Sequence, residues 1–113
     1  MFHYGEGYES YVAELDGAAF LCEEPSEECE EMAKTLAVRC KKRMMALAEF
    51  MLDELDGIYG NLEVETFIER LGKPQIDLER GCVAFLEHDF DDHILEVEYR
   101  GELEEFLSLT MDG

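Results

Sequence analysis

The residues best suited to chemistry gather in one short segment near the carboxyl end, His88-Asp89-Phe90-Asp91-Asp92-His93. Its two imidazoles and three carboxylates could hold a divalent metal ion, because both groups are common metal ligands. The same segment is also typical of a β-turn, in which Asp is favoured and the two histidines flank the turn on adjacent strands. It is not an EF-hand loop, because the glycine and the closing glutamate of that loop are missing. We therefore expect either a turn or a metal site here.

No arrangement of residues predicts an enzyme. The sequence has no G-x-S-x-G, no H-E-x-x-H, no P-loop and no G-x-G-x-x-G. Cys82 with His88 is a conceivable nucleophilic pair, but nearby acidic residues would raise the pKa of the thiol. Pairs of carboxylates are so frequent in this sequence that no single pair indicates a catalytic acid and base. We expect a protein that is not an enzyme and that uses no cofactor.

The charge of the chain narrows the class of partner. With 29 acidic and 9 basic side chains, the 113 residues carry a formal net charge of −20. Such a chain lacks the Lys and Arg that a broad nucleic-acid surface or an anionic membrane requires. Complementary charge would instead speed the encounter with a basic protein and suppress wrong partners. A basic protein is the predicted partner, with no direct contact to nucleic acid or membrane.

The candidate contact residues for that partner are acidic and lie in two places, at the start of a predicted long helix and in the His/Asp turn. They are Glu23, Glu24, Glu27, Glu28, Glu30, Glu31, Asp89, Asp91 and Asp92. The basic residues concentrate in the segment 34–43. The simplest role of this segment is internal neutralisation, for example through Lys34, which follows Glu30 by four residues on the helix.

The elements that position these residues begin with a predicted β-hairpin. Two apolar runs, Tyr8–Leu15 and Ala18–Glu23, flank Asp16-Gly17, which is a strong hairpin signal. A long helix follows from the N-cap Ser26 to Gly57, because apolar residues recur with a period of about 3.6 residues. A helix of about 45 Å is long for a chain of this size, so one end could protrude or the helix could break.

The remaining residues predict a shorter helix and three strands. Asn61–Leu71 carries apolar residues at helical spacing on one face. Cys82–Phe90, His93–Arg100 and Glu102–Met111 favour strands, and a short extended piece at Gln75–Leu78 could precede them. Together these elements predict an α+β fold with an antiparallel three-stranded meander at its carboxyl end and helices on one face of the sheet.

The chain is expected to be a single domain over residues 1–113, in the cytoplasm. The amino-terminal residues show no signal peptide, and no apolar run approaches the roughly 20 residues that span a bilayer. The four cysteines, Cys22, Cys29, Cys40 and Cys82, form no C-x-x-C motif. Cys29 and Cys40 would lie too far apart on a helix for a disulfide. Reduced, buried thiols are the simplest interpretation.

One stretch resembles a known class of proteins. Residues 85–101, from Phe85 to Gly101, and residues 107–113 form the pattern strand, acidic turn with His, strand, Gly turn, strand. This pattern is similar to the end of small acidic bacterial proteins, some of which are immunity proteins of polymorphic-toxin or contact-dependent-inhibition systems. The resemblance implies a binding protein and leaves its partner open.

Three functional hypotheses follow. The first is an immunity protein that neutralises a basic cognate toxin by direct binding, and a nuclease is the favoured class of toxin. The second is a nucleic-acid mimic that inhibits a DNA-binding protein, with acids spaced like phosphates along an elongated face. The third is a small metal-binding protein that uses His88 and His93.

Overall fold

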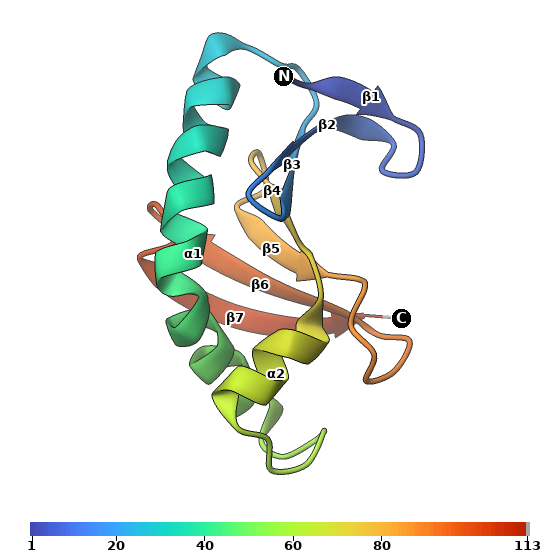
Figure 1. The fold of residues 1–113 in the computed structure, drawn as a ribbon, viewed down its shortest axis with the longest axis vertical. Helices are drawn as coiled ribbons and strands as arrows, with labels where there is room; N and C mark the ends of the chain where they lie inside the picture. Colours follow the sequence, from blue (N-terminus) through green and yellow to red (C-terminus); the bar gives the residue numbers. More distant parts are fainter. Residues whose placement is uncertain (113) are drawn as a thin grey trace.

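The computed structural model describes residues 1–112, which fold into two helices and one seven-stranded sheet (Figure 1). The strands are β1 (His3–Gly5), β2 (Ser10–Leu15), β3 (Ala18–Cys22), β4 (Pro74–Asp77), β5 (Cys82–Phe85), β6 (Ile94–Arg100) and β7 (Glu105–Asp112), and the helices are α1 (Glu27–Leu55) and α2 (Val64–Leu71). The predicted α+β class is confirmed. The predicted three-stranded meander understates the sheet, because β5, β6 and β7 are only part of it.

The strands lie in the sheet in their order along the chain. All neighbouring pairs are antiparallel except β3 and β4, which are parallel. A parallel pair needs a long crossover connection, and here the segment with α1 and α2 supplies it. The extended piece predicted near Gln75 is thus a central strand that joins the amino-terminal hairpin to the meander.

The hairpin forms where the sequence predicted it. Asp16 and Gly17 have φ angles of 51° and 81°, and they connect Leu15 to its pairing partner Ala18. Positive φ at both central residues is the geometry that suits the twist of a two-residue hairpin, and Asp-Gly tolerates it. The preceding strand β1 was not predicted, and it extends this hairpin by pairing with β2.

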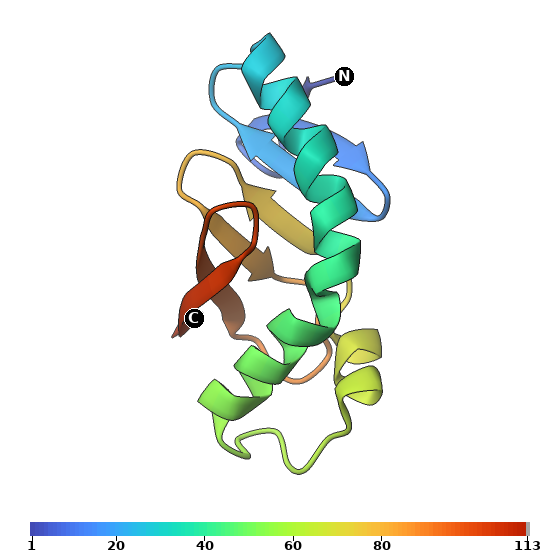
Figure 2. The same ribbon diagram turned by 90° about the vertical axis from the view of Figure 1, so that its left-hand side faces the viewer.

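Helix α1 is continuous over 29 residues and lies across one face of the sheet, and its lower half bends (Figure 2). Its start is fixed by Ser26, whose Oγ accepts a hydrogen bond of 3.2 Å from the Cys29 amide. Its end is closed by Asp56 in the left-handed conformation, followed by Gly57. The helix does not break, and its buried residues are Ala33, Leu36, Ala37, Cys40, Leu47, Ala48, Met51 and Leu55. Its apolar face is only partly covered, because Met32 and Met45 stay exposed.

The core lies between α1 and the sheet and extends to α2. Phe20, Ile76 and Phe85 contribute to it from the sheet, and Phe67 from α2, each fully buried. Within residues 1–112, neither helix has the length and apolar character needed to cross a membrane.

The connection from α2 to β4 packs tightly against the chain after β5. Gly72 has a φ of +77°, and a Cβ placed there would lie 3.2 Å from the Glu87 carbonyl oxygen. Only glycine combines that backbone conformation with so close an approach. The Asp89 amide also donates to the Arg70 carbonyl at 3.3 Å. The loop 86–93 is therefore fixed to the carboxyl end of α2.

Candidate functional site

A groove opens between the first turns of α1 and the turn that joins β6 to β7. Its volume is about 580 Å³. Helix α1 contributes Glu27, Glu28, Glu31, Met32, Thr35 and Leu36, and the end of β6 with the following turn contributes Tyr99, Gly101 and Glu102. Segments far apart in the sequence thus form its two walls.

The groove combines an apolar lining with an acidic rim. Leu36 is buried, Tyr99 is half-buried, and the Met32 side chain is 46% exposed. Burial, together with the nearby Cys82 and Asp77, raises the pKa of Tyr99 to about 12, so this phenol stays neutral at physiological pH. An apolar side chain flanked by Lys or Arg has the chemistry that matches such a groove.

The acidic rim follows from the local sequence. Glu27, Glu28 and Glu30 occupy the first turn of α1, where the helix dipole stabilises negative charge. Glu31 continues the series one turn along the helix, and Glu27, Glu28 and Glu31 are exposed. The acidic residues that stabilise the first turn of α1 therefore also supply carboxylates to the groove.

Two arginines of α1 fix the opposite wall. Arg39 Nε donates to the Glu102 carbonyl at 3.2 Å, and Arg43 donates from Nε to the Leu103 carbonyl at 3.0 Å and from Nη2 to the Glu104 carbonyl at 3.2 Å. Leu103 is buried although its φ is +65°, a conformation that is rare for a residue other than glycine. The arginines hold this turn against α1.

The basic segment 34–43 thus stabilises the fold more through its arginine contacts than through ion pairs with neighbouring acidic residues. Lys41 forms an exposed ion pair of 3.5 Å with Asp16. The expected pair of Lys34 with Glu30 is not among the ion pairs of residues 1–112. Exposed pairs contribute about 0–1 kcal/mol, so the energetic role of the segment rests mainly on the arginine contacts to backbone carbonyls.

Arg43→Met should loosen the wall formed by the β6–β7 turn. It removes two hydrogen bonds from a charged donor to carbonyls, so we expect the free energy of unfolding to fall by about 1–2 kcal/mol. Lys42→Met is the matched control, because it removes the same charge from an exposed position next to Arg43. Urea unfolding followed by circular dichroism measures both variants, and equal losses would contradict the anchoring role.

The two predicted acidic groups lie well apart along the long axis of the molecule. The residues Glu23 to Glu31 surround the upper end of α1, whereas Asp89, Asp91 and Asp92 lie in the loop between β5 and β6 at the lower right (Figure 1). Three of the six acids of the first group line the groove. The structure therefore does not join the predicted contact residues into one surface.

Acids of the loop 86–93 are held by partners within the chain. Asp89 pairs with Arg70 at 2.7 Å, and the Arg70 guanidinium lies 4.2 Å from the centre of the Phe90 ring. Asp91 accepts from the Tyr59 hydroxyl at 2.9 Å and contacts His93 Nδ1 at 2.9 Å. Burial opposes ionisation of Asp91, but its hydrogen bonds with His93 and Tyr59 outweigh it and lower the pKa of this carboxyl. Asp92 and Glu87 are exposed, and among residues 1–112 neither forms an ion pair.

The buried His88 organises the same loop. Its Nδ1 accepts a hydrogen bond of 3.3 Å from the Phe90 amide, so Nε2 carries the proton and donates to the His93 carbonyl. Both ring nitrogens are thus occupied in a neutral imidazole. Among residues 1–112, no group of three or more His, Cys, Asp or Glu side chains is placed to hold a metal ion. Residues 86–93 form a loop held by side-chain contacts, and both histidines lie outside β5 and β6, which corrects the predicted turn with His88 and His93 on adjacent strands.

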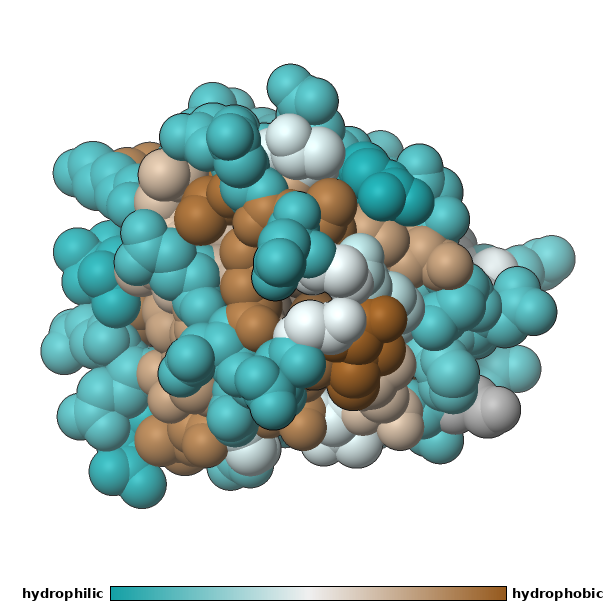
Figure 3. All heavy atoms as spheres, turned by 90° about the horizontal axis from the view of Figure 1, so that it is seen from below, coloured by the Kyte–Doolittle hydropathy of each residue, from teal (hydrophilic) through white to brown (hydrophobic). Residues whose placement is uncertain are grey.

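The lower end of the molecule offers a second exposed surface. Figure 3 shows hydrophobic side chains gathered between hydrophilic ones on this face. Ile58 and Leu86, in the loops that border α2, are among the exposed large hydrophobic residues. The nearby rings of Tyr59 and Phe90 stack at 4.5 Å. Because Asp89 and Asp91 are paired internally, this end is less suited than the groove to attract a basic partner.

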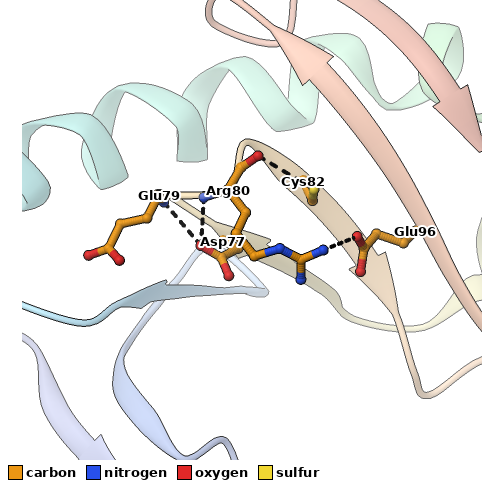
Figure 4. A network of polar contacts seen from close by, with 5 residues as sticks. All are labelled: Asp77, Glu79, Arg80, Cys82 and Glu96. Atoms are coloured by element: carbon orange, nitrogen blue, oxygen red, sulfur yellow. Dashed lines mark hydrogen bonds and ion pairs between the residues drawn. The ribbon is translucent and has the colours of Figure 1, made fainter.

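Cys82 lies in a polar network at the turn between β4 and β5 (Figure 4). Asp77 Oδ1 accepts from the amides of Glu79 and Arg80, both at 3.0 Å, and Arg80 pairs with Glu96 at 2.7 Å. Burial and the adjacent Glu96 raise the pKa of the Cys82 thiol to about 11. Cys82 starts β5, whereas His88 follows the opposite end of that strand. A Cys82–His88 nucleophilic pair is therefore not formed.

No local pattern of residues predicts the wall of the groove that lies opposite α1. Tyr99, Gly101 and Glu102 reach it only through the docking of the β6–β7 turn. The resulting site is a groove with an apolar lining and an acidic rim. Comparison of the chain with protein-family models, curated proteins and solved structures finds no match.

Proposed function

We propose that this chain is a non-enzymatic acidic binding protein that takes a basic protein segment into the groove between α1 and the β6–β7 turn. One observation carries the proposal: apolar side chains and four carboxylates line the same groove. The carboxylates belong to Glu27, Glu28, Glu31 and Glu102. Burial of an apolar anchor would supply affinity, and the carboxylates would select Lys or Arg beside it.

In its most specific form, we propose an immunity protein that binds a basic toxin domain in the cytoplasm, with a nuclease as the favoured class of toxin. A net charge of −20 supports a basic partner, because a small domain needs only about 2–8 charges for solubility. A nuclease supplies the required basic surface, since it must bind phosphates. The four free thiols agree with a reducing compartment.

The second candidate is a nucleic-acid mimic that occupies a DNA-binding protein. The elongated shape, with extents of 42 × 27 × 21 Å, and the acids around the start of α1 favour it. A phosphate mimic has no need of an apolar groove, however, so the groove favours the first candidate. Binding that survives loss of the groove lining would favour the mimic.

Charge reversal at the groove tests the proposal. The variant Glu27→Lys/Glu28→Lys/Glu31→Lys should weaken binding of a fluorescent peptide with a central Leu between Lys and Arg residues by tenfold or more. A matched control is available on the same helix, where Glu49→Lys/Asp53→Lys/Glu54→Lys makes the same change of charge at exposed positions far from the groove. Fluorescence anisotropy at about 50 and 500 mM NaCl measures both.

We expect the control variant to retain most of the affinity and the wild-type affinity to fall with salt, because screening weakens attraction between exposed charges. Equal loss in the two variants would show attraction by net charge alone and would refute the groove as the site. Affinity unchanged by salt would refute the electrostatic part of the proposal.

A further inference from the structure

Two cysteines from different elements meet beside the start of α1. Cys22 is the last residue of β3 and is buried, whereas Cys29 lies in the first turn of α1 and is partly exposed. Their Sγ atoms are 2.6 Å apart, and both residues are free thiols. The pair is separate from Cys40 in the middle of α1 and from Cys82 in β5.

Contacts outside the two thiols fix this arrangement. The Ser26 hydroxyl caps α1 through the Cys29 amide, and Cys29 Sγ lies 3.7 Å from the Glu24 carbonyl. On the other side, Glu79 Oε1 accepts from the Glu23 amide at 2.9 Å and lies 3.6 Å from Cys22 Sγ. Figure 4 shows the Glu79 side chain extending away from the Arg80–Glu96 pair, which leaves its carboxylate for these contacts. Strand, helix cap and the β4–β5 turn thus position the thiols together.

We propose that Cys22 and Cys29 are a redox modification site, which closes to an intramolecular disulfide by exchange with a small-molecule disulfide such as oxidised glutathione. The Cys29 thiolate attacks one sulfur of the reagent, forms a mixed disulfide and expels one thiolate. Cys22 then attacks the Cys29 sulfur and expels the second thiolate. The two cysteine protons end on the two released thiols, so one small disulfide is reduced and one protein disulfide is formed.

The order of these steps follows from the surroundings of each thiol. Cys22 is shielded, and burial together with Cys29 and Glu79 raises its pKa to about 12. Cys29 is the more accessible sulfur, so it meets the reagent first. Because Cys22 already contacts it, the second step is intramolecular and should outcompete attack by a further external thiol.

Closure would connect the start of α1 covalently to the end of β3. This is the helical turn that carries Glu27 and Glu28 to the groove. The crosslink restricts the unfolded chain, so the oxidised protein should melt higher, by about 10 °C. Formation of this disulfide does not depend on the proposed binding function.

Intact mass after incubation with oxidised glutathione tests the site on the wild-type chain. We expect a loss of two hydrogen atoms with no retained glutathione, and proteolytic mapping should join the peptides of Cys22 and Cys29. Cys29→Ser should lose both the crosslink and the redox-dependent melting shift. Cys40→Ala, which leaves the pair intact, should keep both.

Glutathione that remains attached to wild-type Cys29, or a crosslink that maps to Cys40 or Cys82, would overturn the proposal. The same holds if the crosslinked protein melts at the temperature of the reduced protein. Because mass and mapping are read on the wild type, a poorly folding variant does not obscure the result.

Discussion

Phe67→Ala should lower the free energy of unfolding by about 3–5 kcal/mol, because it removes a large, fully buried ring and leaves a cavity. Phe67 is the main inward residue of α2, and its ring centre lies 5.5 Å from that of Phe90. Phe90 in turn stacks on Tyr59. The substitution would therefore loosen α2, the loop 86–93 and the chain before α2 together.

Phe106→Ala provides the comparison. Phe106 is only half-buried on the edge strand β7, where its ring lies 5.9 Å from that of Phe50. We expect a distinctly smaller loss there, because less apolar surface leaves water on folding. Urea unfolding of both variants at neutral pH gives the two free energies. Equal losses would contradict the central position assigned to Phe67.

Features with local causes could be predicted from the sequence. The hairpin required only Asp16-Gly17 between apolar runs, and α1 required only its apolar period and the Ser26 cap. The meander of β5, β6 and β7 was predicted as well, although its first strand ends at Phe85 rather than Phe90. There the loop is held by His88 and Asp91, whose side-chain contacts no periodicity reveals.

Features that depend on distant partners could be predicted only in part, since β4 was expected as a short extended piece but not as a central strand of the sheet. Strand β4 is four residues long and begins with Pro74, so it has little local signal. Its place in the sheet follows from parallel pairing with β3, across the whole helical crossover. The three residues of β1 likewise become a strand only by pairing with β2.

The two walls of the groove differ in the same way, because one could be predicted from local sequence and the other depends on distant contacts. Glu27, Glu28 and Glu31 were candidates because acidic residues cluster at the start of α1. The opposite wall with Tyr99 and Glu102 was missed, because its position depends on the contacts that Arg39 and Arg43 make to the turn. The Cys22–Cys29 contact was also missed, because one thiol ends a strand, the other starts a helix, and helical spacing relates neither to the other.

Raising the pH from about 8 to 11 should destabilise the protein steeply. Burial raises the pKa of Cys40 from 9.0 to about 11, and burial with nearby negative charge raises that of Tyr99 from 10.0 to about 12. The folded state thus keeps both groups neutral at pH values where the unfolded chain ionises them. The stability due to each group is complete below its unfolded pKa and is lost as the pH rises through its folded pKa. Urea unfolding at several pH values under a reducing agent measures this loss.

The variant Cys40→Ala isolates the contribution of one thiol to the loss of stability at high pH. Two pKa units at this buried thiol correspond to about 3 kcal/mol in total, of which about 2 kcal/mol is lost between pH 9 and 11. The variant loses packing at every pH, but it has no thiol at position 40 to ionise. Over this pH interval its free energy of unfolding should therefore fall less than that of the wild type, by about 2 kcal/mol. Repulsion among the 29 acidic side chains is the same in both proteins and cancels in the comparison. Parallel curves for the two proteins would show that ionisation of Cys40 does not limit the alkaline stability.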